Sequence, residues 1–315
     1  MRPFRPALLT ALLLAPLLAP PPAFGWHDTG HMLVSQIAYL GLTPEARARV
    51  DKLLVTPADK RPYIHLCAGY YSAQTCEKTY DPVTIGVWMD DFRGDSLNEH
   101  YAPWHYINYN PFFDGIPARP NVGPEPENVM SRLYWAINTL RAGTGRERTD
   151  AEVLGFLYHL VGDVHQPLHT STRYTAAKPD GDAGGNGFSI EAPRGTNYSN
   201  LHSFWDAAAG EFGESPRRPL DAATRERLRR TAEALIKEHP VASTPGARDL
   251  DPHTWVVESN QLARRQVYPG AAEGQAPSPE YTQRARRLSR QRIALAGHRL
   301  AGVLNSLFVG AEEKR

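Results

Sequence analysis

Cysteine is scarce in this chain: its 315 residues include only Cys67 and Cys76. Two cysteines cannot form the dense disulfide framework of a small secreted scaffold, and they lack the close spacing usual for zinc-binding thiolates. In an exported protein we expect them to form one local disulfide within a tyrosine-rich loop. Such a bridge would stabilise the loop and would not define the fold.

An excess of charge of either sign is also missing, because 35 Lys and Arg residues stand against 34 Asp and Glu residues. The formal net charge of +1 gives no indication of a broad basic face for duplex nucleic acid. Four arginines gather near the C-terminus, at 284, 286, 287 and 290, but such a run is usually a solvated helix face. Any attraction for an anionic substrate must then come from the site itself.

The N-terminal 25 residues differ in composition from the rest of the chain. Arg2 and Arg5 precede an apolar run at 7–18, and the small residues that a signal peptidase prefers follow at 23–25. The run is shorter than the ~20 residues of a spanning helix and contains Pro16, which disfavours the alternative of an uncleaved membrane anchor. We therefore expect residues 1–25 to be a cleaved secretory signal peptide and the protein to be periplasmic or secreted.

Removal of that segment leaves 33 basic residues against 34 acidic ones, a formal charge of −1. The remaining residues, 26–315, contain no internal repeat and no convincing linker. We expect them to form one domain without stable membrane association, and we expect that domain to be a monomer.

Convincing runs of alternating strand pattern are few, whereas amphipathic helical patterns joined by Pro- and Gly-rich loops recur. The sequence therefore predicts an all-α fold, a single globular domain of mostly antiparallel packed helices. The expected helices occupy 31–40, a segment beginning at Thr43-Pro44, 85–93, 128–141, a segment beginning at Thr149-Asp150, the segment around 202–206, 221–237, 253–266 and 278–308.

Two histidine–aspartate pairs carry the first chemical signal: His159 with Asp163, and His202 with Asp206. A spacing of four residues stacks two side chains on one face of a helix, so each pair could bind a metal ion. Gly155 precedes His159 by another four residues, and we expect it to leave room beside the metal-binding face.

Three further features lie outside the two histidine–aspartate pairs. They are Trp26 with His31 shortly after it, the aspartates Asp90 and Asp91, and His105. Histidine nitrogen and carboxylate oxygen are ligands that zinc favours. Taken singly, each residue has an ordinary explanation as a core histidine, a helix cap or an ion-pair partner. Their joint occurrence favours a site for several zinc ions, in which Asp90 fits better than Asp91.

With these motifs in order, the sequence resembles the single-strand-specific zinc nucleases of the S1/P1 type, a family related in fold to the zinc phospholipases C. The resemblance covers residues 26 to about 206. The matching elements are Trp26 followed by Gly30-His31, Trp88-Met89-Asp90 with Arg93, His105-Tyr106, His159 and Asp163 with the segment from Gln166 to His169, and the segment from Asn200 to Asp206.

The resemblance implies a cofactor of three Zn²⁺ ions. Asp163 would bridge the first ion and the second, and a cleaved N-terminal Trp26 would give its amine and carbonyl to the second. The implied ligands are Asp90, His105, His159 and Asp163 for the first ion, Trp26, His31 and Asp163 for the second, and His169, His202 and Asp206 for the third.

The same resemblance implies hydrolysis of phosphodiester bonds in single-stranded DNA and RNA to 5′-nucleotides, with 3′-nucleotidase activity. Water bridging the close pair of ions would have its pKa lowered from 15.7 toward roughly 7, giving a hydroxide nucleophile. The catalytic residues would be Asp90 and Asp163, through the metals, and Arg93, through a charged hydrogen bond to the phosphate.

Substrate contacts are expected at four positions. Tyr106 would stack on a base, and Asn108 stands where the fungal relatives carry an aspartate that binds the base edge. Because asparagine both donates and accepts hydrogen bonds, the base preference of the relatives is not carried over. Gly185 and Asn186, in a loop longer than that of the relatives, complete the expected substrate-binding set.

Two other functions are compatible with these residues. The first is a zinc phospholipase C acting on phospholipid head groups, although the short gap between Trp26 and His31 and the aspartate at 206 favour the nuclease. The second is an exported zinc-storage or structural domain, whose metal sites would be closed to water.

Overall fold

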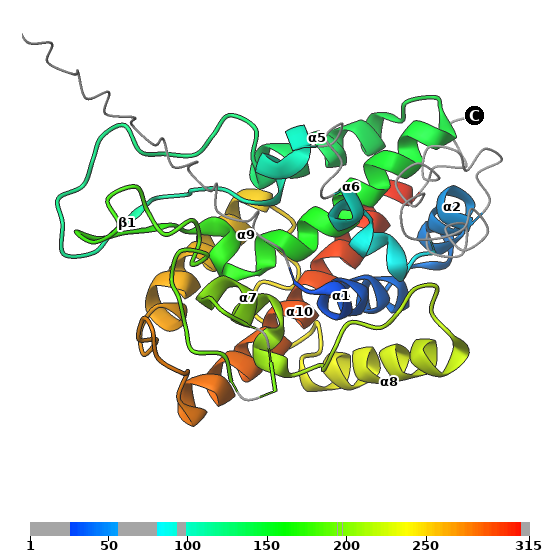
Figure 1. Ribbon diagram of the computed structural model, residues 1–315. Helices are drawn as coiled ribbons and strands as arrows, with labels where there is room; N and C mark the ends of the chain where they lie inside the picture. Colours follow the sequence, from blue (N-terminus) through cyan, green and yellow to red (C-terminus); the bar gives the residue numbers. More distant parts are fainter. Residues whose placement is uncertain (1–25, 56–80, 93–98, 194, 197, 310–315) are drawn as a thin grey trace, which may run out of the picture.

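The computed structural model describes residues 26–55, 81–92, 99–193, 195–196 and 198–309. The expected signal peptide, both cysteines and Arg93 lie outside this part of the chain. Helices dominate what is described (Figure 1). Their bounds are α1 Asp28–Leu40, α2 Pro44–Val55, η1 Thr84–Phe92, η2 Glu99–His105, α5 Val129–Ala142, α6 Glu147–His165, η3 Pro167–Thr170, α7 Leu201–Asp206, η4 Ala208–Gly210, α8 Ala222–Glu238, α9 Pro252–Leu262, η5 Ala263–Val267 and α10 Pro279–Phe308.

The predicted all-α class is confirmed. The described strands, β1 (Phe112–Phe113) and β2 (Arg173–Tyr174), are two residues each and pair in parallel. The starts of α2 and α5 carry capping residues, of which Thr43 was expected from the sequence. Thr43 accepts a hydrogen bond from the backbone of Ala46 ahead of Pro44, and Asn128 forms a capping box with Ser131 at the start of α5.

Helix α6 lies in the middle of the molecule, between α5 and α1 in Figure 1, with the long α10 beside it. Nearly every residue of α6 from Asp150 to its end is buried, so the helix is covered on all sides. Helices α1 and α10 lie so close together at Gly297 that a Cβ atom there would overlap the side chain of Ile37. The missing side chain of this glycine therefore permits the close packing. Helix α6, which carries His159 and Asp163, therefore lies within the core, with α1 and its His31 beside it.

Two local predictions about α6 are wrong. The helix begins at Glu147, not at Thr149-Asp150, and Asp150 instead accepts hydrogen bonds from the backbone and hydroxyl of Thr144. Gly155 does not make room at the metal face. A Cβ atom there would lie 2.6 Å from Cε3 of Trp88, so the missing side chain accommodates the indole.

Among the described helices, none has an apolar stretch of the length needed to span a bilayer.

Candidate metal centre

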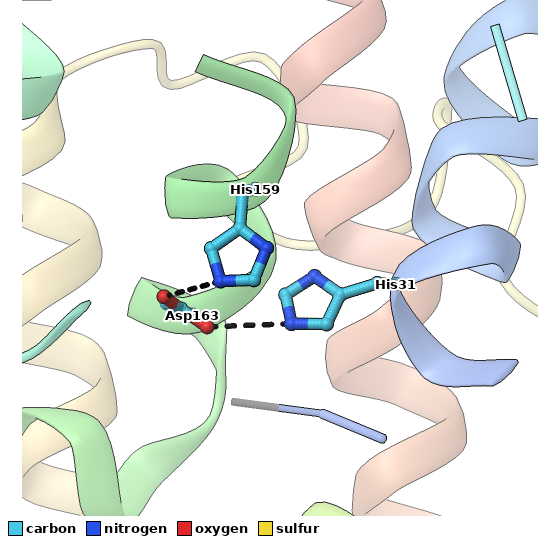
Figure 2. Close-up of side chains that lie close together, drawn as sticks. All are labelled: His31, His159 and Asp163. Carbon is cyan, nitrogen blue, oxygen red and sulfur yellow. Dashed lines mark ion pairs between the residues drawn. The ribbon is translucent and has the colours of Figure 1, made fainter. Parts of the chain in front are cut away.

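The centre is built around His159 and Asp163, which lie one turn apart on α6 and are both fully buried. Figure 2 shows His31 reaching toward them from the neighbouring helix α1. Nε2 of His31 lies 3.4 Å from Oδ1 of Asp163, and Nε2 of His159 lies 3.1 Å from Oδ2 of the same carboxylate. These three residues form the first of three groups. Within each group, the atoms that could bind a metal all lie within 4.8 Å of one another.

A glycine on α6 creates the space for this approach. A Cβ atom at Gly162 would lie 2.5 Å from Nδ1 of His31, so α6 can accept the imidazole only where it lacks a side chain. The rings of His31 and His159 then stack with centroids 4.1 Å apart and an interplanar angle of 13°.

The second group shares His159 with the first and adds Asp90 from η1 and His105 from the end of η2. Oδ1 of Asp90 is 3.5 Å from Nε2 of His159 and 4.0 Å from Nδ1 of His105. Nδ1 of His105 also lies 2.9 Å from Oδ2 of Asp163, which faces both groups. Asp91 points elsewhere, because Arg218 holds it through two hydrogen bonds, one of 2.7 Å.

The third group consists of His169 from η3 with His202 and Asp206 from α7. All three side chains are buried, and Nε2 of His202 lies 3.4 Å from Oδ2 of Asp206. A gap of 3.9 Å between Nδ1 of His169 and Oδ1 of Asp163 shows that this group adjoins the other two.

Three of the histidines contact a backbone carbonyl through Nδ1, which is the way metal-binding histidines are usually oriented. In the neutral tautomer with a proton on Nδ1, that nitrogen donates and Nε2 keeps its lone pair. The contacts are His159 to Gly86 O at 2.7 Å, His169 to His105 O at 2.6 Å and His202 to Gly184 O at 2.6 Å.

Some buried polar atoms at the centre have no hydrogen-bond partner among the described residues. They are both ring nitrogens of His31 and Oδ1 of Asp163. Buried polar groups are otherwise nearly always satisfied, and leaving one unpaired costs about 1–3 kcal/mol. A cation bound by Nε2 of His31 and Oδ1 of Asp163 would satisfy these two atoms, so the residues fit a zinc-type metal.

Burial and charge act in opposite directions on the ionisation of the centre. Burial lowers the pKa of His31 and lowers that of His105 to about 4, despite the nearby Asp163. Burial would also lower the pKa of His159, but the carboxylates of Asp163 and Asp90 outweigh it and raise the value to about 9. A proton on His159 and a metal cation therefore compete for the same negative charge.

Asp163 remains ionised in this setting. Burial alone would raise its pKa, but the surrounding histidines, His159 and His169 first, hold the value well below its usual range. The centre thus contains a fully buried carboxylate whose charge needs compensation.

Trp26 lies at the start of the described chain with its side chain fully buried. A Cβ atom at Gly30 would lie 2.6 Å from Cβ of Trp26, so this glycine lets the tryptophan fold back on α1. The next residue, His27, donates its backbone N–H to the carbonyl of Asp206 at 2.8 Å. The tryptophan is therefore tethered to the helix that carries the third group, while ligation by its amine and carbonyl stays a prediction.

The four expected substrate-binding residues lie on the loops beside the centre. Tyr106 is partly exposed, and Asn108 donates to Oε1 of Glu125 at 3.3 Å while its carbonyl accepts from the hydroxyl of Thr172. The carbonyl of Gly185 accepts from the backbone of His202 at 3.3 Å. Asn186 is partly exposed and donates to the carbonyl of Ala183 at 2.9 Å, so these positions have structural contacts whatever they bind.

Several residues that orient the centre were given no role from the sequence. They are Gln166, whose amide contacts Asp206, and the carbonyl groups of Gly86 and Gly184. The signal for Gln166 was a polar residue between two expected ligands and directly before a proline. A backbone carbonyl leaves no such signal in a sequence.

Comparison with known proteins agrees with the geometry. A family model described as S1/P1 Nuclease matches residues 26–309. The chain is 26% identical to Endonuclease 2 of Arabidopsis thaliana over 312 residues, covering 93% of each chain. It is 30% identical to Endonuclease 5 of the same plant over 301 residues, covering 91% of each. Nuclease S1 of Aspergillus oryzae is 24% identical over 297 residues, which cover 90% of this chain and 91% of that protein.

Proposed function

The chain belongs to the S1/P1 nuclease family, and from this premise we propose that it is a three-zinc phosphodiesterase. Its substrates are single-stranded DNA and RNA, which it hydrolyses to 5′-nucleotides, and it removes the phosphate of 3′-nucleotides at the same site. The observation that carries the proposal is the set of three adjoining His/Asp groups in the buried centre.

The donor set supports three divalent ions in electrostatic terms. Three zinc ions bring a charge of +6, against −3 from Asp90, Asp163 and Asp206, so the loaded centre keeps a charge of about +3. That surplus attracts a phosphate although the chain as a whole is nearly neutral.

Bound zinc supplies Lewis acidity, which polarises a phosphoryl oxygen and lowers the pKa of water at the site. The residues of the chain would hold the zinc ions and fix the orientation of the side chains that bind them. Asp163 faces both of the first two groups, and the carbonyls of Gly86 and Gly184 fix the rings of His159 and His202. Arg93, which follows η1 and lies three residues after Asp90, donates hydrogen bonds to the phosphate.

Tyr106 supplies an aromatic ring on which a base can stack, and this contact requires an unpaired base. Duplex substrates are therefore cleaved poorly. Asn108 offers the base an amide whose carbonyl already accepts from Thr172, so the edge that it recognises differs from the one that an aspartate would bind.

Processing of the N-terminus controls activity in this proposal. An α-amine titrates near 7.7 to 8.0 and can bind zinc, whereas an amide nitrogen within an uncleaved precursor cannot. Cleavage of the signal segment 1–25 during export then produces the active chain, which begins at Trp26. A chain with one extra residue before Trp26 is expected to lose zinc and activity, and full zinc content with full activity would contradict this.

The function is tested by comparing substrates with the purified mature chain. We expect faster hydrolysis of denatured DNA than of duplex DNA or phosphatidylcholine, loss of activity with a chelator, and recovery with Zn²⁺. Faster turnover of the lipid would replace the nuclease with a phospholipase C. Bound zinc without any turnover of nucleic acid, 3′-nucleotide or lipid would indicate a storage or structural domain.

A further inference from the structure

Gln166 lies in the turn between α6 and η3 and contacts three of the expected ligands. Its backbone N–H donates to the carbonyl of Asp163 at 2.9 Å, and its own carbonyl accepts from the backbone of His169 at 3.0 Å. Its side-chain Nε2 donates to Oδ1 of Asp206 at 2.6 Å. The side chain is fully buried, and hydrolysis as proposed above assigns it no part.

The orientation of this amide follows from its second contact. The backbone N–H of Leu168 donates to Oε1 of Gln166 at 2.6 Å. Because a backbone N–H can only donate, the acceptor must be the amide oxygen, which leaves Nε2 facing Asp206. Pro167 adds to this by holding Gln166 in an extended conformation, with φ −81° and ψ 115°, at the end of α6.

Because of the contact with Gln166, the two carboxylate oxygens of Asp206 have different partners. Oδ1 accepts from Gln166, while Oδ2 faces Nε2 of His202 at 3.4 Å. A donor on one oxygen limits rotation of a carboxylate and keeps the other oxygen directed toward a cation. Since Asp206 is 40 residues away in sequence, this link also fixes α7 against the end of α6.

We propose that Gln166 is a positioning residue for the third metal, acting through Asp206. This inference rests on the proposed function, because it requires an ion in the third group. The side chain holds Oδ2 of Asp206 toward His202, and the ion in that group is retained more tightly as a result.

The first experiment measures zinc retention by the mature holoprotein against increasing concentrations of a chelator. Gln166→Met keeps the length of the side chain and removes its donor. We expect the wild-type chain to hold three ions and the variant to lose one of them at a chelator concentration at least about 10-fold lower. The other two ions are expected to dissociate as in the wild type.

Asn305→Leu is the matched control, because Asn305 also bridges two segments through its amide. It accepts from the backbone of Thr43 at 2.9 Å and donates to the carbonyl of Gly41 at 3.0 Å, away from the three groups. This variant is expected to lower the melting temperature while releasing all three ions at wild-type chelator concentrations.

A second experiment separates action through Asp206 from a general structural role. In an Asp206→Asn background, Gln166→Met should cause no additional loss of zinc. Wild-type retention in the single variant, loss of all three ions together, or a further loss in the double variant would each overturn the inference. A wild-type chain without a third ion would overturn the three-zinc function itself, which is a distinguishable result.

Discussion

Asp163 contacts histidines of both the first and the second group of the centre. Its Oδ1 lies 3.4 Å from His31, and its Oδ2 lies 2.9 Å from His105 and 3.1 Å from His159. The carboxylate is fully buried and ionised, so no solvent can replace a lost partner. Its replacement should therefore affect two metal sites at once.

Asp163→Asn is expected to lower kcat/KM on single-stranded DNA by at least about 1,000-fold, or about 4 kcal/mol, because it removes a shared anionic ligand. Zinc content should fall with it. The matched control is Asp150→Asn, another buried carboxylate of α6, which contacts Thr144 and Arg49 rather than the centre. Steady-state kinetics and zinc analysis of both variants check this, and equal losses in the two would contradict it.

At the residue scale, the resemblance predicted nine metal ligands, and the structure brings eight of these residues into three adjoining groups that could hold a metal. The sequence did not predict which groups orient these side chains. The partner of Gln166 is 40 positions away, and the acceptors for His159 and His202 are backbone carbonyls that any residue could provide.

At the scale of elements, α6 depends on glycines for two different reasons. Gly155 accommodates Trp88, and Gly162 accommodates His31. The two positions are two turns apart on one helix and differ in what an added methyl group would displace.

Gly162→Ala should push the imidazole of His31 away from Asp163 and weaken zinc binding. Gly155→Ala should displace the indole of Trp88 and cost about 1–3 kcal/mol of unfolding free energy, as overpacking in a core commonly does. The pair is compared by zinc titration and by denaturant unfolding of the metal-loaded protein. If Gly155→Ala weakened zinc binding as much as Gly162→Ala, the assignment of Gly162 to the metal face would be wrong.

Helix positions followed from periodicity and capping residues, which act over a few residues. The start of α6 was missed because Asp150 resembles a cap but bonds back to Thr144. The role of Gly155 was missed because Trp88 lies 67 positions earlier in the chain, and a helical pattern does not show which residue packs against it.

At the scale of the whole molecule, an ionic network with buried arginines and a partly exposed glutamate joins α10 and α9 to the end of α6. Arg299 donates to both carboxylate oxygens of Glu258, at 2.7 and 2.8 Å, and to Nε2 of His165 at 3.0 Å. Arg292 donates to the carbonyl of His165 at 3.1 Å. The network places positive charge near the C-terminal end of α6, where the helix dipole favours it.

Glu258 should make the stability of the protein depend on pH. Burial raises its pKa, but Arg299 and Arg292 outweigh burial and hold the value below 4.5. The folded state therefore binds fewer protons than the unfolded state as pH falls below about 4.5, so this contribution is complete above that pH and is lost below it.

Glu258→Gln is expected to be less stable than the wild type at pH 7, with a difference that shrinks as pH falls below 4.5. Denaturant unfolding at several pH values checks the trend. Glu238→Gln, which removes a more exposed partner of Arg290, should change stability less. A difference between the wild type and Glu258→Gln that is constant from pH 7 to pH 3 would contradict the role of the network.

If the three groups hold zinc ions that support cleavage of single-stranded nucleic acid, bound metal and activity must rise together. The most direct measurement adds Zn²⁺ stepwise to the chelated mature chain and records bound metal together with the release of 5′-nucleotides from denatured DNA. We expect no release from the metal-free chain and full activity once three ions per chain are bound. Full activity without metal, or no release with all three ions bound, would contradict it.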